Sequence, residues 1–150
     1  MTVAITLHIL SAVIWVGGMF FAYMVLRPVA GTLLEPPTRL PLWSEVFGRF
    51  FPWVWLSVIL LLVTGFWIIS IYGGMGNVGM HIHTMLLLGI IMILIFMHLF
   101  FSPYKKLKRN VASQDWQAAG ANLNTIRLLV GINLILGFIV IAIATGGRYL

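Results

Sequence analysis

The side chains best suited to chemistry in this sequence are four histidines, two of which lie in the stretch GMHIHTM. His81 and His83 open a long apolar run there, and His8 lies near the start of another. Neutral imidazole is a common ligand of copper and iron, and a thioether such as that of Met85 favours Cu(I). Thiolate sites, iron–sulfur clusters and covalent haem attachment are excluded because the sequence has no cysteine.

The elements that position these histidines must belong to a membrane protein. The chain has 150 residues, of which 61% are hydrophobic and 8% are charged. Soluble domains carry about 25% charged residues, so this chain cannot cover itself with a water-exposed surface. Its nine Lys and Arg, against three Asp and Glu, lie between apolar runs and indicate orientation in the membrane. We therefore expect lipid, and no nucleic acid, as a partner.

Four apolar runs are long enough to cross a bilayer, which needs about 20 helical residues. They predict membrane spans at about 3–26, 52–72, 80–101 and 125–145. The 1–2 connection contains Trp43 and Phe47 at helical spacing, and the 3–4 connection contains a polar stretch that Ser113 could cap. The sequence thus predicts an all-α integral membrane protein, a single domain forming a four-transmembrane-helix bundle. Short interfacial helices are expected in the 1–2 and 3–4 loops.

Basic residues are divided unevenly between the two sides of this bundle. One side has only Arg148 and the amino terminus. The other side holds Arg27, Arg39, Arg49, Lys105, Lys106, Lys108 and Arg109, with Arg127 just inside the fourth span. The positive-inside rule predicts that both long loops are cytoplasmic and both termini periplasmic. We expect a multi-pass protein of a bacterial-type inner membrane, with the histidine pair facing the periplasm.

Three of the histidines fall at similar depth in the outer leaflet. At 1.5 Å per residue, His8 lies about 8 Å below the outer boundary of span 1, and His81 and His83 lie about 2 and 5 Å into span 3. His8 shares one helical face with Ser11 and Trp15, whereas His81 and His83 point to nearly opposite faces. This arrangement predicts a metal centre between spans 1 and 3.

A b-type haem held between His8 and one histidine of span 3 is the first expectation, because facing helices of a bundle can supply both axial ligands. Arg127 and Asn133, in or near span 4, are candidates for binding a haem propionate or a quinone. His98 lies about 22 Å along span 3 from His83. We expect it to be structural or to contact lipid head groups, and it is a candidate ligand only for a second centre. The cofactor-binding candidates are His8, His81, His83, Ser11, Trp15, Arg127 and Asn133, and the metal-ligand candidates are His8, His81, His83 and His98.

Copper is the alternative ligand, because thioether and imidazole groups together suit Cu(I). The residues that would capture the ion cluster at the mouth of span 3. They are Met75, Met80, His81, His83 and Met85. Methionine also fills gaps in apolar cores, so packing accounts for most of the eight methionines.

Several stretches resemble the membrane domain of the copper resistance D (CopD) family. They are LHILSAVIWVGGMFFAYMVLRP, with its histidine followed by W-x-G-G, LPLWSEVFGRFFPWVW, LLLVTGFW and RLLVGINLILG. The chain is also distantly similar to the HemJ-type membrane protoporphyrinogen oxidases, although His83 stands where that family has a lysine. Arg127 and Asn133 partly match residues of its last span. The first resemblance implies copper import, and the second implies haem b.

The sequence accordingly predicts a haem b protein that acts in transmembrane or quinone-linked electron transfer, which leaves open a membrane-bound haem oxidoreductase. The alternatives are a copper importer and a non-catalytic membrane scaffold. Quinone, or a periplasmic partner that carries electrons or copper, would be a partner in the first two cases. A homo-oligomer is compatible with all three. Paired carboxylates and serine or lysine nucleophiles are missing from the spans, which argues against hydrolysis.

Overall fold

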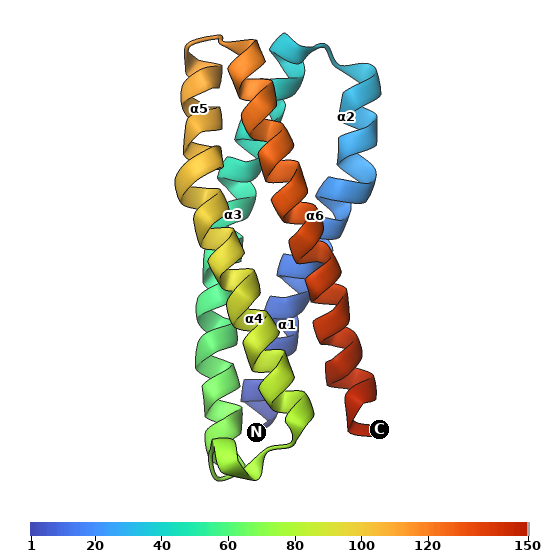
Figure 1. The fold of residues 1–150 in the computed structure, drawn as a ribbon, viewed down its shortest axis with the longest axis vertical. Coiled ribbons are helices and arrows are strands. Elements are labelled where there is room, and N and C mark those ends of the chain that lie inside the picture. The colour runs from blue at the N-terminus through green and yellow to red at the C-terminus, as the bar shows by residue number, and fades with distance from the viewer. Residues whose placement is uncertain (150) are drawn as a thin grey trace.

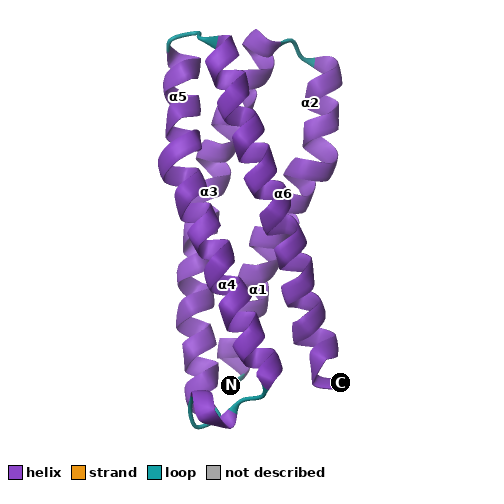
Figure 2. Ribbon diagram, in the orientation of Figure 1, coloured by secondary structure: helices purple, strands orange, loops and turns teal. Residues whose placement is uncertain are grey.

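Four long helices make up the protein. The structure, a computed structural model, describes residues 1–149 apart from the side chain of Arg148, and its described part contains helices and short connections without strands (Figures 1 and 2). Each of the four helices is long and apolar enough to cross a membrane. They extend over Thr2–Leu33, Pro36–Ile71, Met80–Ala112 and Trp116–Gly146. The predicted all-α bundle of four transmembrane helices is confirmed.

Two of the long helices change pitch next to a proline. The first long helix consists of α1 (Thr2–Phe20), a π-helical turn (Phe21–Leu26) and α2 (Arg27–Leu33). The third consists of α4 (Met80–Leu99), a π-helical turn (Phe100–Tyr104) and α5 (Lys105–Ala112). Pro28 and Pro103 lack an N–H and crowd the carbonyl four residues earlier. The wider π turn accommodates each proline without ending the helix.

The other two long helices, α3 (Pro36–Ile71) and α6 (Trp116–Gly146), begin well before the predicted spans. The expected interfacial helices are therefore the first turns of these same helices. In α3 the reason is burial: Trp43, Phe47 and Phe51 repeat every four residues and all face the core. In α6 the cap is Asp115 and not Ser113, because the Asp115 carboxylate accepts a hydrogen bond of 3.2 Å from the Ala118 N–H.

An aromatic core fills the middle of the bundle. Helix α1 packs chiefly on α3, and α4 packs chiefly on α6. The Phe96 ring of α4 lies 6.2 Å from Trp15 of α1 and 5.4 Å from Phe51 of α3, centroid to centroid. Phe51 also lies 4.9 Å from Tyr104. These edge-to-face contacts tie three of the four long helices together.

The W-x-G-G motif brings α1 close to α3. A Cβ atom on Gly18 would overlap the ring of Phe50, whereas one on Gly17 would meet nothing within 4 Å. Gly137 of α6 is similarly close to α1, since a Cβ there would lie 2.9 Å from a methyl group of Val16. Small residues at helix crossings are the usual means of close packing in membranes, and only the second glycine of the motif serves it here.

The connections place different chemistry at the two ends of the bundle (Figure 1). We call one end the histidine end; it comprises the start of α1, residues 72–79, the start of α4 and the end of α6. We call the other end the arginine end; it comprises α2, the start of α3, α5 and the start of α6. The turn at the histidine end requires glycine, because Gly73 and Gly74 have φ angles of +93° and +104°.

The outer faces of the helices are apolar along the spans. Val63 of α3, Leu87 of α4 and Ile135 of α6 are 58%, 60% and 62% exposed. A soluble protein would present polar side chains at such positions. In a membrane protein these faces meet lipid, which is what the hydropathy of the four spans predicts.

Candidate functional site

His8 lies on the buried face of α1, about two turns from the amino terminus. Ala4, Ser11, Trp15 and Met19 share that face and are buried. The imidazole is half-buried, and its Nδ1 lies 2.8 Å from Oγ1 of Thr64, which comes from α3 and is 1% exposed. Span 1 is thereby joined to span 2 through a polar contact inside the apolar bundle.

The hydrogen bonds of Thr64 favour one tautomer of His8. The Thr64 hydroxyl donates its one proton to the carbonyl of Leu60, in the preceding turn of α3. Its oxygen then accepts from His8, so Nδ1 carries the imidazole proton in this tautomer. Nε2 of the neutral ring keeps its lone pair. A histidine held in this way by its other ring nitrogen is the usual form of a metal ligand.

Gly65 of α3 lies next to the imidazole of His8. A Cβ atom at Gly65 would lie 3.4 Å from Cε1 of His8, so the ring rests against the α3 backbone. Sequence reasoning missed both Thr64 and Gly65. Their signal was present as a hydroxyl next to a glycine within the apolar stretch LLLVTGFW.

The structure separates the two histidines of α4. The buried residues of α4 are Met92, Phe96 and Leu99. At 3.6 residues per turn, all three lie within about 60° of His81 around the helix axis, and His83 lies nearly opposite. The Cβ of His81 is also 3.3 Å from the position that a Cβ on Gly147 would occupy. His81 therefore shares the interior face of α4 and lies beside the end of α6.

The histidine end offers single ligands from several segments. Among the described residues, no group of three or more His, Cys, Asp and Glu side chains comes together to hold a metal. The thioethers Met75 and Met80 lie at the rim, 38% and 77% exposed. Imidazole from α1 and α4, with thioether from the rim, is a donor set of the kind that suits Cu(I).

Several predicted site residues lie apart from these donors or serve packing. The Ser11 hydroxyl donates 2.8 Å to the carbonyl of Leu7 in its own helix, and the Trp15 ring packs in the aromatic core. His98 is exposed in the last turn of α4, toward the arginine end. That position fits the structural or head-group role expected from the sequence.

Arg127 and Asn133 are not brought to the histidines. Arg127 lies twenty residues before Gly147, which is about 30 Å along α6, and it lines a cavity at the arginine end. Asn133 is 2% exposed, and its Nδ2 donates 3.1 Å to the carbonyl of Met92 in α4. Its Oδ1 is buried and has no hydrogen-bond partner among the described residues. Asn133 thus forms an interhelical hydrogen bond in the middle of the bundle.

Comparison with known proteins gives two matches. Residues 44–146 match the family described as Copper resistance protein D (CopD); this range leaves α1, and so His8, outside it. The chain is also 31% identical over 139 residues to an uncharacterized protein of Aquifex aeolicus (strain VF5), which covers 88% of this chain and 93% of that protein. No solved structure matches the chain.

Proposed function

Because this chain belongs to the copper resistance protein D (CopD) family, we propose that it is a multi-pass membrane protein that binds copper at its histidine end and carries it into the membrane. The resemblance to the CopD family, predicted from the sequence, is confirmed. Copper, which the sequence offered as the alternative to haem, becomes the first candidate because the family description names it. The protein is then an importer or resistance protein that treats the ion as cargo.

The observation that carries this proposal is the hydrogen-bond chain from His8 through Thr64 to the carbonyl of Leu60. When Nδ1 donates to Thr64, a neutral imidazole keeps Nε2 free, and this is the form that coordinates metal. Neutral imidazole also avoids the cost of a buried charge.

The other donors fit a route from the rim inward. Met75 and Met80 are exposed and would meet the ion first, and His81 lies on the interior face of α4. Farther along the bundle, Met19 and Met92 are both 3% exposed and supply thioethers within the core. Passage beyond them requires the packed rings of the aromatic core to move.

A b-type haem is the second candidate, and the same imidazole favours it. His8 from α1 and His81 from the interior face of α4 would hold the haem, one from each of two helices. Haem would supply one-electron chemistry when bound. This candidate uses neither Arg127 nor the exposed His98, since both lie toward the arginine end.

Copper binding tests the proposal directly. Full-length protein purified in a nonionic detergent is titrated with Cu(I) against a chromogenic Cu(I) chelator. We expect stoichiometric copper that His8→Ala abolishes and that His98→Ala, an exposed histidine on the same protein, leaves unchanged. Failure of His8→Ala to alter copper affinity would contradict the proposal. A Soret band in the purified protein that His8→Ala removes would instead establish the haem candidate.

A further inference from the structure

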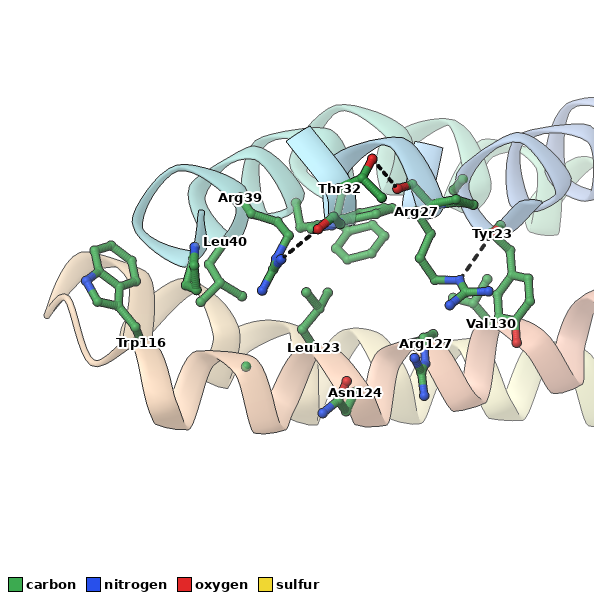
Figure 3. Close-up of a pocket in the computed structure, with 17 residues that line it drawn as sticks. Tyr23, Arg27, Thr32, Arg39, Leu40, Trp116, Leu123, Asn124, Arg127 and Val130 are labelled. Carbon is green, nitrogen blue, oxygen red and sulfur yellow. Dashed lines mark hydrogen bonds between the residues drawn. The ribbon is translucent and has the colours of Figure 1, made fainter. Parts of the chain in front are cut away.

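A cavity of about 450 Å³ opens at the arginine end, between α2, the start of α3 and the start of α6. This volume lies within the roughly 300–1,000 Å³ range of small-molecule sites. Figure 3 shows Arg27 and Arg39 extending from α2 and α3 toward α6, and Leu123 pointing into the space from α6. The cavity lies at the opposite end of the bundle from the proposed copper donors.

Three arginines line the cavity, and the described residues of its wall include no acidic side chain. Arg27 donates from Nε to the carbonyl of Tyr23 at 3.2 Å, and its guanidinium lies 4.6 Å from the centre of the Tyr23 ring. Arg39 donates from Nη1 to the carbonyls of Gly31 and Leu34, both at 3.4 Å. Backbone carbonyls and one ring therefore position these two guanidinium groups without neutralising them.

Most of the hydrogen-bonding capacity of these arginines remains free. A guanidinium has five N–H donors, and the contacts above use one nitrogen of Arg27 and one of Arg39. The third arginine, Arg127, is exposed on the α6 wall. Forked guanidinium groups that line one cavity, with no carboxylate among its described lining residues, suit the charge and geometry of a phosphate group.

Apart from the arginines and a few polar residues such as Thr32 and Asn124, the wall is apolar. Leu40, Trp43 and Phe47 contribute it from α3, and Leu123 and Val130 contribute it from α6. A bare anion would use only the arginines. A ligand with a phosphate group on an apolar body would use the whole wall.

The cavity also straddles the expected boundary between lipid and water. Hydropathy places this end of span 1 near residue 26 and the start of span 4 near residue 125. Arg27 and Arg127 stand next to those two limits, whereas the lining residues Ala22 and Val130 lie inside them. Phospholipid phosphates lie at this depth of a bilayer.

We propose that this cavity binds the phosphate group of an anionic phospholipid, with the acyl region against the apolar wall. Arginines of the wall hold the phosphate, and Tyr23 keeps Arg27 in place because the Tyr23 ring packs closely against α6, where a Cβ added to Gly131 would lie 3.0 Å from it. The bound lipid would link α2 to α6. This site is independent of copper, so neither proposal depends on the other.

Native mass spectrometry of the full chain in nonionic detergent tests the site. Phosphatidylglycerol and phosphatidylcholine with the same acyl chains are titrated separately. We expect one retained phosphatidylglycerol, and Arg39→Gln should weaken it about tenfold, as expected for a lost charge-assisted hydrogen bond. Arg109→Gln removes a charge at the same end from a residue outside the cavity and should leave binding unchanged. Equal effects of the two variants would overturn the proposal.

A second pair of variants tests the site if Arg39→Gln fails to fold. One variant fills the cavity, and the other is a control outside it. A Cβ on Gly120, which lines the cavity, or on Gly89 of α4 would meet nothing within 4 Å. Both glycines are helical, so Gly120→Leu and Gly89→Leu should favour the helix. Gly120→Leu should block the lipid, and Gly89→Leu should not. Retained binding in Gly120→Leu would overturn the proposal.

Competition separates the two sources of phosphate. Inorganic phosphate and glycerol 3-phosphate carry the same group as the lipid without its acyl chains. We expect neither to displace phosphatidylglycerol at equal concentration. Displacement by either at that concentration, or equal retention of phosphatidylcholine, would overturn the assignment of an anionic lipid.

Discussion

The two ends of the bundle hold their polar side chains by different means. At the histidine end, one hydroxyl fixes the ring of His8, and that hydroxyl is itself committed to the carbonyl of Leu60. At the arginine end, carbonyls hold Arg27 and Arg39, and the walls carry no compensating acid. The first arrangement presents one lone pair to a cation, and the second presents several N–H groups to an anion.

This difference teaches what to look for in an apolar bundle. The uncharged hydroxyl of Thr64 can lie about 10 Å inside α3, seven residues before the helix ends at Ile71, because burying it does not bury a charge. Uncompensated charge is tolerated only near the water boundary. The aromatic core around Phe51 and Phe96 separates the two ends. We therefore expect each end to be altered by mutation without affecting the other.

The largest expected effect concerns which end faces the cytoplasm. The positive-inside rule predicts that the arginine end is cytoplasmic. Alkaline phosphatase fused to the carboxyl terminus should be active, and the same enzyme inserted near Gln114, between α5 and α6, should be inactive. The reversed pattern would place the copper donors in the cytoplasm and turn the proposed import into export.

The next effect distinguishes the two histidines of α4. His81 shares the interior face with Met92, whereas His83 points away from it. His81→Ala should weaken Cu(I) binding at least as much as loss of an outer-shell partner does, about tenfold. His83→Ala should change the affinity much less. Chelator competition measures both, and a larger loss in His83→Ala would show that α4 is rotated when copper binds.

A smaller effect tests the packing that brings His8 to α3. Leucine at Gly18 overlaps the Phe50 ring, whereas leucine at Gly17 points into open space. Gly18→Leu should destabilise the protein by about 1–3 kcal/mol, as overpacked cores do. Gly17→Leu should not. Thermal unfolding in detergent compares them, and equal midpoints would show that α1 and α3 are less closely packed than described.

The smallest effect belongs to the middle of the bundle. Asn133→Leu loses the hydrogen bond to Met92 but also removes a buried carbonyl oxygen that has no partner. Interhelical hydrogen bonds in membranes contribute about 0.6 kcal/mol on average. The free energy of unfolding should therefore change by less than about 1 kcal/mol. A loss above about 2 kcal/mol would show that Oδ1 is hydrogen-bonded in the folded protein.

The sequence predicted the spans because their apolar length is a strong signal, and it predicted the shared face of His8, Ser11 and Trp15 because that depends only on helical spacing. It did not predict the long first part of α3. Trp43 and Phe47 suggested an interfacial helix, because amphipathic spacing does not reveal whether a bundle or a lipid surface covers the apolar face. The structure shows that Tyr104 and the rest of the core cover it.

The residues that contact the site residues could not be predicted from the sequence for a related reason. Thr64 lies 56 residues from His8, and such pairing depends on the relative rotation and height of α1 and α3. The arginine cavity was missed because Arg27 and Arg39 were interpreted only as charges that set orientation, and Arg127 was considered as a ligand only for a haem propionate or a quinone. Their convergence becomes visible only when α2, α3 and α6 are placed together.

The central claim is that Thr64 holds His8 as a metal ligand, and the Cu(I) affinity of Thr64→Val tests it most directly. This variant keeps the shape of the side chain and removes the acceptor of the Nδ1 proton. Thr145→Val is the matched control, because the Thr145 hydroxyl also bonds the carbonyl four residues earlier but serves no imidazole. We predict Cu(I) binding about 10–100-fold weaker for Thr64→Val, as for other lost outer-shell partners, and unchanged for Thr145→Val. Wild-type affinity in Thr64→Val would contradict the claim.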